Sequence, residues 1–315
     1  MKATIDDKSF IELFEEIGPR PLARRIGVGF RKVLERRVRL ENKYRRQITA
    51  PDGSLRSTRR NIEHEHRLRL SVDNGVVLIG SDSHYIPGHI TTAHRAFVKF
   101  ARELKPKIII KNGDELDFPK ASRHIPIGWE KRPDLIDEIE WAQERLQEIE
   151  DAAPKAIRTW PLGNHDSRWE TRLATLVPEY ARTFGFKLKD HFKSWTPCWA
   201  TWINDDVVVK HRWKGGDNAP YNNTIKSGKT IFTGHLHSLQ VRPYSDYNGT
   251  RFGVDCGTMA DPYGDAFYNY TEDNSVDWRS GFIVATFHKG RLLWPEVVHV
   301  VNKNEVDFRG KIYKI

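Results

Sequence analysis

The sequence has few of the residues on which several common protein classes depend. Only two of its 315 residues are cysteine, Cys198 and Cys256, and their separation matches no metal-binding pattern. A chain of this length does not need a disulfide for stability, so we expect two structural thiols. These counts argue against a disulfide-rich scaffold and against a site in which thiolates hold a metal.

Long apolar segments are also missing from the sequence. No stretch approaches the roughly 18 consecutive apolar residues that a membrane-spanning helix requires. The first residues, MKATIDDKSFIELFEE, carry acids where a secretory signal carries an apolar segment. We therefore expect a cytoplasmic protein with no membrane partner.

The residues that are present indicate a globular protein with an aromatic interior. Hydrophobic residues make up 38% of the chain and charged residues 30%, and the aromatic residues include 10 Trp, 10 Tyr and 15 Phe. A chain of 315 residues can bury a substantial core. The length favours one large catalytic domain with a small accessory module.

Positive charge is concentrated in one part of the chain. The formal net charge is +9, but between Arg20 and Arg60 fourteen basic residues stand against three acidic ones, a local net charge of +11. The remainder is close to neutral. A basic module joined to a near-neutral body indicates that one part holds a polyanion on which the other part acts.

The basic region predicts a helical module of residues 1–61, followed by a catalytic domain of residues 62–315. Residues 9–47 have helical periodicity, and the polar segment 48–61 reads as a linker that ends near Asn61. Within the module, Ala23, Gly27 and Val33 have the spacing of a helix-turn-helix. The segment resembles a DNA-binding helix-turn-helix, which often works as a dimer. That resemblance implies DNA as a partner, a possible homodimer, and nucleic-acid contacts from Phe30, Arg31, Lys32, Arg36 and Arg37. The alternative is that the charge run is a solvated helix face.

The rest of the chain reads as an α/β protein with a strand-rich C-terminal half. Apolar strands at 76–80 and 108–111 flank an amphipathic helix near 93–104, and a second helix over 133–153 leads into the strand AIRTWPLG. Beyond Lys187 the pattern changes to short strands separated by Gly, Asp and Asn. The Asp73–Asn74–Gly75 turn predicts a β-hairpin between HRLRLSV and VVLIGSD.

Five polar clusters follow apolar strands, where a sheet delivers side chains to its edge. They are Asp82-Ser83-His84, Gly113 to Asp117, Gly163 to Asp166, the single His211, and Gly234 to His237. Imidazole nitrogens with carboxylate and amide oxygens form the donor set for manganese, iron or zinc. The alternating spacings DxH and HxH place both donors of a pair on one side of an extended segment.

The order DxH, GDxxD, GNHD, a lone His and GHxH resembles the calcineurin-like metallophosphoesterases, over roughly residues 76–238. The resemblance implies an α/β/β/α sandwich of two mixed sheets flanked by helices, and a binuclear centre. The first metal would be held by Asp82, His84, Asp114 and His237. Asp114 would bridge to a second metal held by Asn164, His211 and His235. Both ions would be divalent transition metals, with manganese favoured and iron, zinc or nickel as alternatives.

The same resemblance implies a mechanism and roles for three further residues. A hydroxide that bridges the metals would attack phosphorus in line. His165, oriented by Asp166, would assist the leaving oxygen, and Arg168 would bind phosphate as the matching Arg of GNHESR does in the family's protein phosphatases. Those phosphatases have Arg after the last Asp of GDxxD, where this chain has Phe118. This departure favours the diesterase and nuclease branches.

We therefore expect an enzyme, a metal-dependent phosphodiesterase or nuclease that acts on DNA. One alternative is a phosphomonoesterase or a small-nucleotide phosphodiesterase whose N-terminal module serves localisation. The other is a non-catalytic DNA-binding regulator that retains the fold as a scaffold.

Overall fold

The computed structural model describes residues 5–51, 64–264, 267, 271 and 274–315. The chain divides into two compact units, residues 1–63 and 64–315, and each is described by itself. The boundary expected near Asn61 lies outside the described residues. Among the described helices, none is both long enough and apolar enough to cross a membrane.

The described residues of the N-terminal unit form three short helices, as the periodicity predicts. They are α1 (Asp7–Ile17), α2 (Pro19–Arg25) and α3 (Phe30–Tyr44). Asp6 caps α1 by accepting from the backbone N of Ser9 at 3.0 Å, and Gly18 ends it with a φ of 76°, which favours glycine. The helices enclose a small core of Phe10, Phe14, Leu22, Ala23, Ile26, Val33, Leu40 and Ile48.

Two mixed sheets form the body of the larger unit. In the described part of the chain, the six-stranded sheet has the order β1 (Leu68–Leu70), β6 (Thr201–Ile203), β7 (Val207–Val209), β8 (Thr230–Thr233), β10 (Gly249–Asp255), β9 (Gln240–Asp246). The nine-stranded sheet has the order β15 (Lys311–Lys314), β14 (Glu305–Phe308), β13 (Glu296–Asn302), β11 (Gly281–His288), β2 (Gly75–Gly80), β3 (Ile108–Lys111), β4 (Ile157–Pro161), β5 (Thr196–Cys198), with β12 (Arg291–Leu292) paired to β11. Strands β2 to β5 are parallel, and β2 pairs with β11 in the antiparallel sense.

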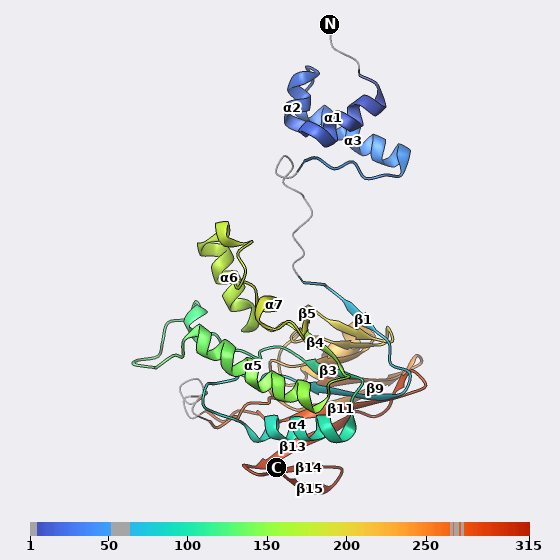
Figure 1. Cartoon of the computed structure of the whole chain (residues 1–315). Coiled ribbons are helices and arrows are strands. Elements are labelled where there is room, and N and C mark those ends of the chain that lie inside the picture. The colour runs from blue at the N-terminus through green and yellow to red at the C-terminus, as the bar shows by residue number, and fades with distance from the viewer. Residues whose placement is uncertain (1–4, 52–63, 265–266, 268–270, 272–273) are drawn as a thin grey trace. The chain divides into compact units, whose positions relative to one another are not determined.

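Successive side chains of the central strands point to opposite faces of the sheet, so their apolar residues belong to two separate cores. Leu78 of β2 and Ile109 of β3 pack with α4 (Thr92–Leu104) and α5 (Leu135–Ala152), which lie together on one face of the nine-stranded sheet (Figure 1). Their neighbours Val77, Ile79 and Ile108 instead pack with side chains of the six-stranded sheet.

A helix also covers the outer face of the six-stranded sheet. Helix α8 (Ala219–Ser227) packs on β8, β9 and β10, and a Cβ added to Gly253 of β10 would lie 1.8 Å from the carbonyl oxygen of Pro220 in α8. Further helices in the described residues are η1 (Pro119–Ala121), α6 (Asp166–Leu176), η2 (Pro178–Tyr180) and α7 (Leu188–His191). The layers are therefore helix, sheet, sheet, helix, and the expected α/β/β/α class is confirmed.

The hairpin predicted at Asp73–Asn74–Gly75 is wrong. The flanking strands belong to different sheets, because β1 pairs with β6 while β2 lies between β3 and β11. The turn is held by other segments: Gly290 donates its backbone N–H to the carbonyl of Asp73, and Lys289 donates to Asn74 Oδ1. The turn itself is present, but a tight turn does not require its flanking strands to pair.

Candidate metal centre

The polar clusters gather where strands of both sheets end. Asp82, Asp114 and Asn164 follow the parallel strands β2, β3 and β4, so their loops leave the same edge of the nine-stranded sheet. His211 and His235 follow β7 and β8, which are parallel neighbours in the other sheet. The two sheets therefore deliver ligands to one region from opposite sides.

Backbone hydrogen bonds join these loops to one another. Asp82 donates its backbone N–H to the carbonyl of Gly113 at 2.8 Å, and His84 donates to the carbonyl of Asp114 at 3.0 Å. Gly234 donates to the carbonyl of His211 at 2.7 Å. The spacing of the ligands is thus set by the main chain as well as by their side chains.

The backbone of this centre adopts conformations that most residues avoid. Five of the seven predicted ligands have positive φ in the left-handed region: Asp82 (55°), His84 (40°), Asp114 (53°), His235 (73°) and His237 (61°). For a non-glycine residue this typically costs about 1 kcal/mol or more, and such residues cluster at functional sites. The fold maintains this strain at the positions that aim donors into the centre.

Two glycines are required by the close approach of the ligands. A Cβ on Gly163 would lie 2.0 Å from Asp114 Oδ1, and a Cβ on Gly234 would lie 2.4 Å from Asp82 Oδ2. A side chain at either position would displace a carboxylate of the centre.

The ligand atoms form two groups. Those of Asp82, His84 and His237 lie within 4.8 Å of one another, as do those of Asp114, His211 and His235. The groups are adjacent, since His211 Nε2 lies 4.0 Å from Asp82 Oδ1 and 3.1 Å from Asp114 Oδ2. The first group contains three of the four ligands predicted for the first metal, and the second contains Asp114 with two of the three further ligands predicted for the second metal.

Several donor atoms of the centre are free to bind metal. His84 directs Nδ1 to Asp117 at 3.3 Å, and His211 directs Nδ1 to the carbonyl of Asn112 at 2.7 Å. The buried Nε2 of His84 and Oδ1 of Asn164 have no hydrogen-bond partner among the described residues, and His211 Nε2 faces Asp114 Oδ2 at 3.1 Å. Ligating histidines commonly bond their other ring nitrogen in this way, and an unpaired buried polar atom costs about 1–3 kcal/mol. A divalent cation would satisfy these atoms.

Histidines beside the two central carboxylates favour their ionised form. Burial opposes ionisation of Asp82, but His211 and His237 lower its pKa to about 2. Burial likewise acts against Asp114, and His211 is the main reason that its pKa still lies below the usual range. Both carboxylates are therefore ionised near neutral pH and available as metal ligands.

His165 and Arg168 lie together beside the two groups. His165 donates its backbone N–H to Asp114 Oδ1 at 2.8 Å and directs its side-chain Nδ1 to Asp117 Oδ1. Arg168 donates Nη2–H to His165 Nε2 at 3.1 Å and Nη1–H to the carbonyl of Asp117 at 2.8 Å. With Nε2 as acceptor, this arrangement assigns the proton to Nδ1, where Asp117 accepts it.

Asp166 does not have the predicted role of orienting His165. Its carboxylate accepts hydrogen bonds from Trp160 Nε1 and from the backbone N–H groups of Asp114, Glu115, Leu116 and Gly163, at 2.8–3.3 Å. Asp166 therefore anchors the GDxxD loop from beneath, and Asp117 orients His165. The sequence offered a sign of this role for Asp117, because Asp117 is the last residue of the GDxxD motif.

Sequence reasoning missed a buried ion pair behind the centre. Lys111 Nζ lies 2.9 Å from Glu115 Oε2 and donates to Ser83 Oγ at 2.7 Å, and both charged side chains are fully buried. Burial lowers the pKa of Lys111 and raises that of Glu115 to about 7. Because Ser83 separates two predicted ligands and Glu115 adjoins Asp114, the pair joins the DxH and GDxxD loops. A lysine that ends an apolar strand, with Glu four residues later, was the available signal.

The predicted nucleic-acid contacts on α3 are only partly exposed. Phe30, Arg31 and Lys32 face solvent, although Arg31 pairs with Glu35 at 3.1 Å. Arg36 instead stabilises the unit itself. It donates to the carbonyl of Ile5 and to Asp7, and its guanidinium lies 4.6 Å from the centre of the Phe10 ring.

Arg37 is likewise half-buried, 3.6 Å from Glu41. Because the guanidinium of Arg36 is used within the unit, we no longer count Arg36 among the predicted nucleic-acid contacts. The exposed side chains of Phe30, Arg31 and Lys32 remain predicted contacts.

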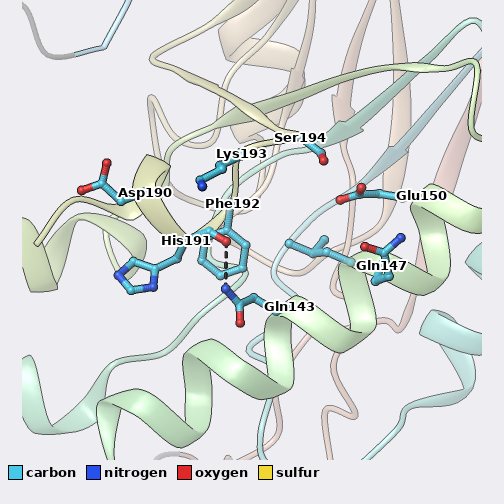
Figure 2. A pocket seen from close by; sticks show the side chains of 9 residues that line it. Gln143, Gln147, Glu150, Asp190, His191, Phe192, Lys193 and Ser194 are labelled. Carbon is cyan, nitrogen blue, oxygen red and sulfur yellow. Dashed lines mark hydrogen bonds between the residues drawn. The ribbon is translucent and has the colours of Figure 1, made fainter. Parts of the chain in front are cut away.

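A separate surface cavity of about 370 Å³ lies between α5 and residues 190–194. Figure 2 shows Gln143 of α5 reaching across it to donate a hydrogen bond to the carbonyl of His191, at 2.8 Å. Its lining also includes Gln147 and Glu150, and none of the predicted ligands. The cavity is distinct from the metal centre.

Comparison with known proteins gives two kinds of similarity, and no family model matches the chain. Gene 54 protein of Mycobacterium phage L5 is 23% identical over 245 residues, covering 70% of this chain and 92% of that protein. Gene 54 protein of Mycobacterium phage D29 is 25% identical over 235 residues, covering 66% and 87%. Vps29 from Entamoeba histolytica, solved as the wild type complexed with zinc, aligns at a TM-score of 0.39 and 10% identity over 76% of this chain and 98% of its own. The function proposed below is therefore argued from the geometry of the centre and not from these similarities.

Replacing Asp114 with Asn is expected to remove bound metal, because a charged oxygen is lost from the middle of the centre. The decrease in affinity should exceed the roughly 10- to 100-fold that follows loss of a residue behind a ligand. Elemental analysis of dialysed protein measures the metal-to-protein ratio, with exposed Asp151→Asn as the matched control. An unchanged ratio for Asp114→Asn would contradict the assignment.

Replacing Lys111 with Met should destabilise the protein by about 3–5 kcal/mol, because Glu115 would be left buried without its partner. The double change Lys111→Met and Glu115→Leu should recover most of that loss. Chemical denaturation gives the free energies of unfolding. Lys229→Met, which breaks the exposed pair with Asp206, should cost no more than about 1 kcal/mol. Equal effects of the two lysine changes would rule out a structural role for the buried pair.

Proposed function

We propose that the chain is a binuclear metal-dependent phosphoesterase of the calcineurin-like metallophosphoesterase family. The observation that supports this most directly is the pair of adjacent ligand groups, one around Asp82 and one around Asp114, with unpaired donor atoms at the centre. Divalent ions bound there would supply an activated water and a clamp for the phosphate. The donor set accepts manganese, iron, zinc or nickel, and manganese remains our proposal.

The residues beside the ligands have the chemistry that phosphoester hydrolysis needs. Arg168 offers a guanidinium next to the centre, suited to a phosphate oxygen. His165 lies at the same point, and its Nδ1 contact with Asp117 fixes the orientation of its ring. If Arg168 binds the phosphate instead, His165 Nε2 could take up a proton from solvent and pass it to the leaving oxygen.

We propose a nucleic-acid diester, with DNA favoured, as the substrate. Phe118, which follows Asp117 in place of an arginine, supports a diesterase over a protein phosphatase. The net charge of +11 between Arg20 and Arg60 supports a polyanionic partner for the N-terminal unit. A localisation role for that unit, with a small nucleotide or a phosphomonoester as substrate, is the alternative outcome of the tests below.

Changing His165 to Ala should separate substrates by their leaving group. Cleavage of DNA, whose alkoxide leaving group needs a proton, should fall by about 10²- to 10⁴-fold in kcat. Hydrolysis of bis-p-nitrophenyl phosphate should fall much less, because p-nitrophenolate leaves without a proton. Both rates are measured with Mn²⁺ present, and the metal-to-protein ratio is the control. Equal losses on both substrates would show that His165 does not act on the leaving oxygen.

Removing positive charge from α3 should change how DNA binding depends on salt. The slope of log affinity against log salt becomes shallower by about 0.9 for each phosphate that the protein no longer neutralises. Arg31→Ala and Lys32→Ala should each reduce the slope measured by fluorescence anisotropy on duplex DNA. Lys155→Ala, which removes an exposed charge from the other unit, should not. If neither α3 change alters the slope, Arg31 and Lys32 do not contact DNA.

A further inference from the structure

One exposed loop of the larger unit carries an unusual concentration of apolar side chains. Residues 122–131, named here the apolar finger, lie between η1 and α5, in the segment that projects from the unit ahead of α5 (Figure 1). Ile125, Ile127 and Trp129 expose 84%, 55% and 102% of their surface. Three large apolar side chains exposed to this degree within five residues indicate a candidate interaction site.

Polar residues at the base of the apolar finger hold its two ends together. Arg132 donates to the carbonyl of Pro119 at 2.9 Å, to the carbonyl of His124 at 3.1 Å and to Glu130 Oε2 at 3.0 Å. Lys120 and Asp134 form an ion pair across the base. These bonds fix the ends of the loop.

The base of the apolar finger is joined to the metal centre. Pro119, which Arg132 holds, is two residues beyond Asp117, the residue that orients His165. The intervening Phe118 is buried and donates its backbone N–H to Glu138 of α5 at 2.8 Å. The base of the loop therefore adjoins Asp117, which contacts both His165 and Arg168.

The charges of the apolar finger fit an anionic partner. Glu130 is bonded to Arg132, so the acid inside the loop is already neutralised. Arg123 and Lys131 are exposed and form no ion pair with any other described residue. Apolar and aromatic groups interleaved with free cations match a strand whose bases offer flat faces and whose backbone carries phosphates. Bases are available for stacking only where they are unpaired.

We propose that the apolar finger binds unpaired nucleotides of the DNA substrate beside the scissile phosphate. Trp129 stacks on a base, and Arg123 and Lys131 hold the neighbouring phosphates. The inference rests on the proposed function and narrows it, because it selects single-stranded or junction DNA over continuous duplex.

Site-specific crosslinking in the full-length protein tests this contact. Trp129→p-benzoyl-L-phenylalanine is irradiated with single-stranded DNA, with the matching duplex, and with a duplex that carries a single-stranded tail. Tyr247→p-benzoyl-L-phenylalanine is the matched control, because Tyr247 is an equally exposed aromatic residue in the turn between β9 and β10. We expect crosslinks from position 129 to the single strand and to the tail, and a much weaker yield at position 247.

Kinetics give a second readout with an ordinary variant. Trp129→Ala should lower the ratio of kcat/KM for single-stranded DNA to kcat/KM for bis-p-nitrophenyl phosphate by about tenfold, the loss typical of one stacked base. Tyr247→Ala should leave the ratio unchanged. An unchanged ratio for Trp129→Ala, or equal losses on single strand and duplex, would overturn the proposal.

The outcomes also separate this inference from the proposed function. Crosslinks to the strand from a protein that cleaves neither substrate would support the apolar finger while overturning the enzymatic proposal. Crosslinks from position 129 to a second copy of the chain, association of the protein with phospholipid vesicles through Trp129, or equal crosslinking at positions 129 and 247 would each overturn the apolar finger as a nucleic-acid contact.

Discussion

The rest of the larger unit depends on one constraint. Ionised carboxylates and imidazole nitrogens converge where strands of the two sheets end. Asp82 and Asp114 are buried, and their negative charge is favoured by His211 and its neighbours. An arrangement of this kind is costly without a cation, and five of its ligands add backbone strain. The surrounding structure has to compensate for the buried charge and for the backbone strain, and polar residues do so through specific hydrogen bonds.

Those bonds support the centre from behind. Asp166 gathers four backbone N–H groups and the indole of Trp160, and so shapes the GDxxD loop. Lys111 and Glu115 join that loop to the DxH segment without touching solvent. Asp255 receives the backbone N–H of Ser238 at 3.0 Å and so holds the loop that follows GHxH. Ligands whose supports are themselves fixed have little freedom to move, which favours a preorganised centre.

The layers could be predicted from the sequence, and so could a gathering of Asp and His side chains able to bind metal, because each depends on local pattern or motif order. Pairing partners could not: Asp73 to Gly75 form a turn, yet β1 and β2 enter different sheets. The exchange of roles between Asp117 and Asp166 has a similar origin, since adjacency in GNHD gives no information about which carboxylate reaches His165. Arg36 shows that a basic residue in a charge run can be used by its own fold, as its bonds to Ile5 and Asp7 demonstrate.

Crystals grown with Mn²⁺ and measured at the manganese absorption edge would test the central claim most directly. The account predicts two anomalous peaks about 3.5–4 Å apart, one among Asp82, His84 and His237 and the other among Asn164, His211 and His235, with Asp114 in contact with both. A single peak elsewhere on the surface, or two peaks that Asp114 does not touch, would contradict it.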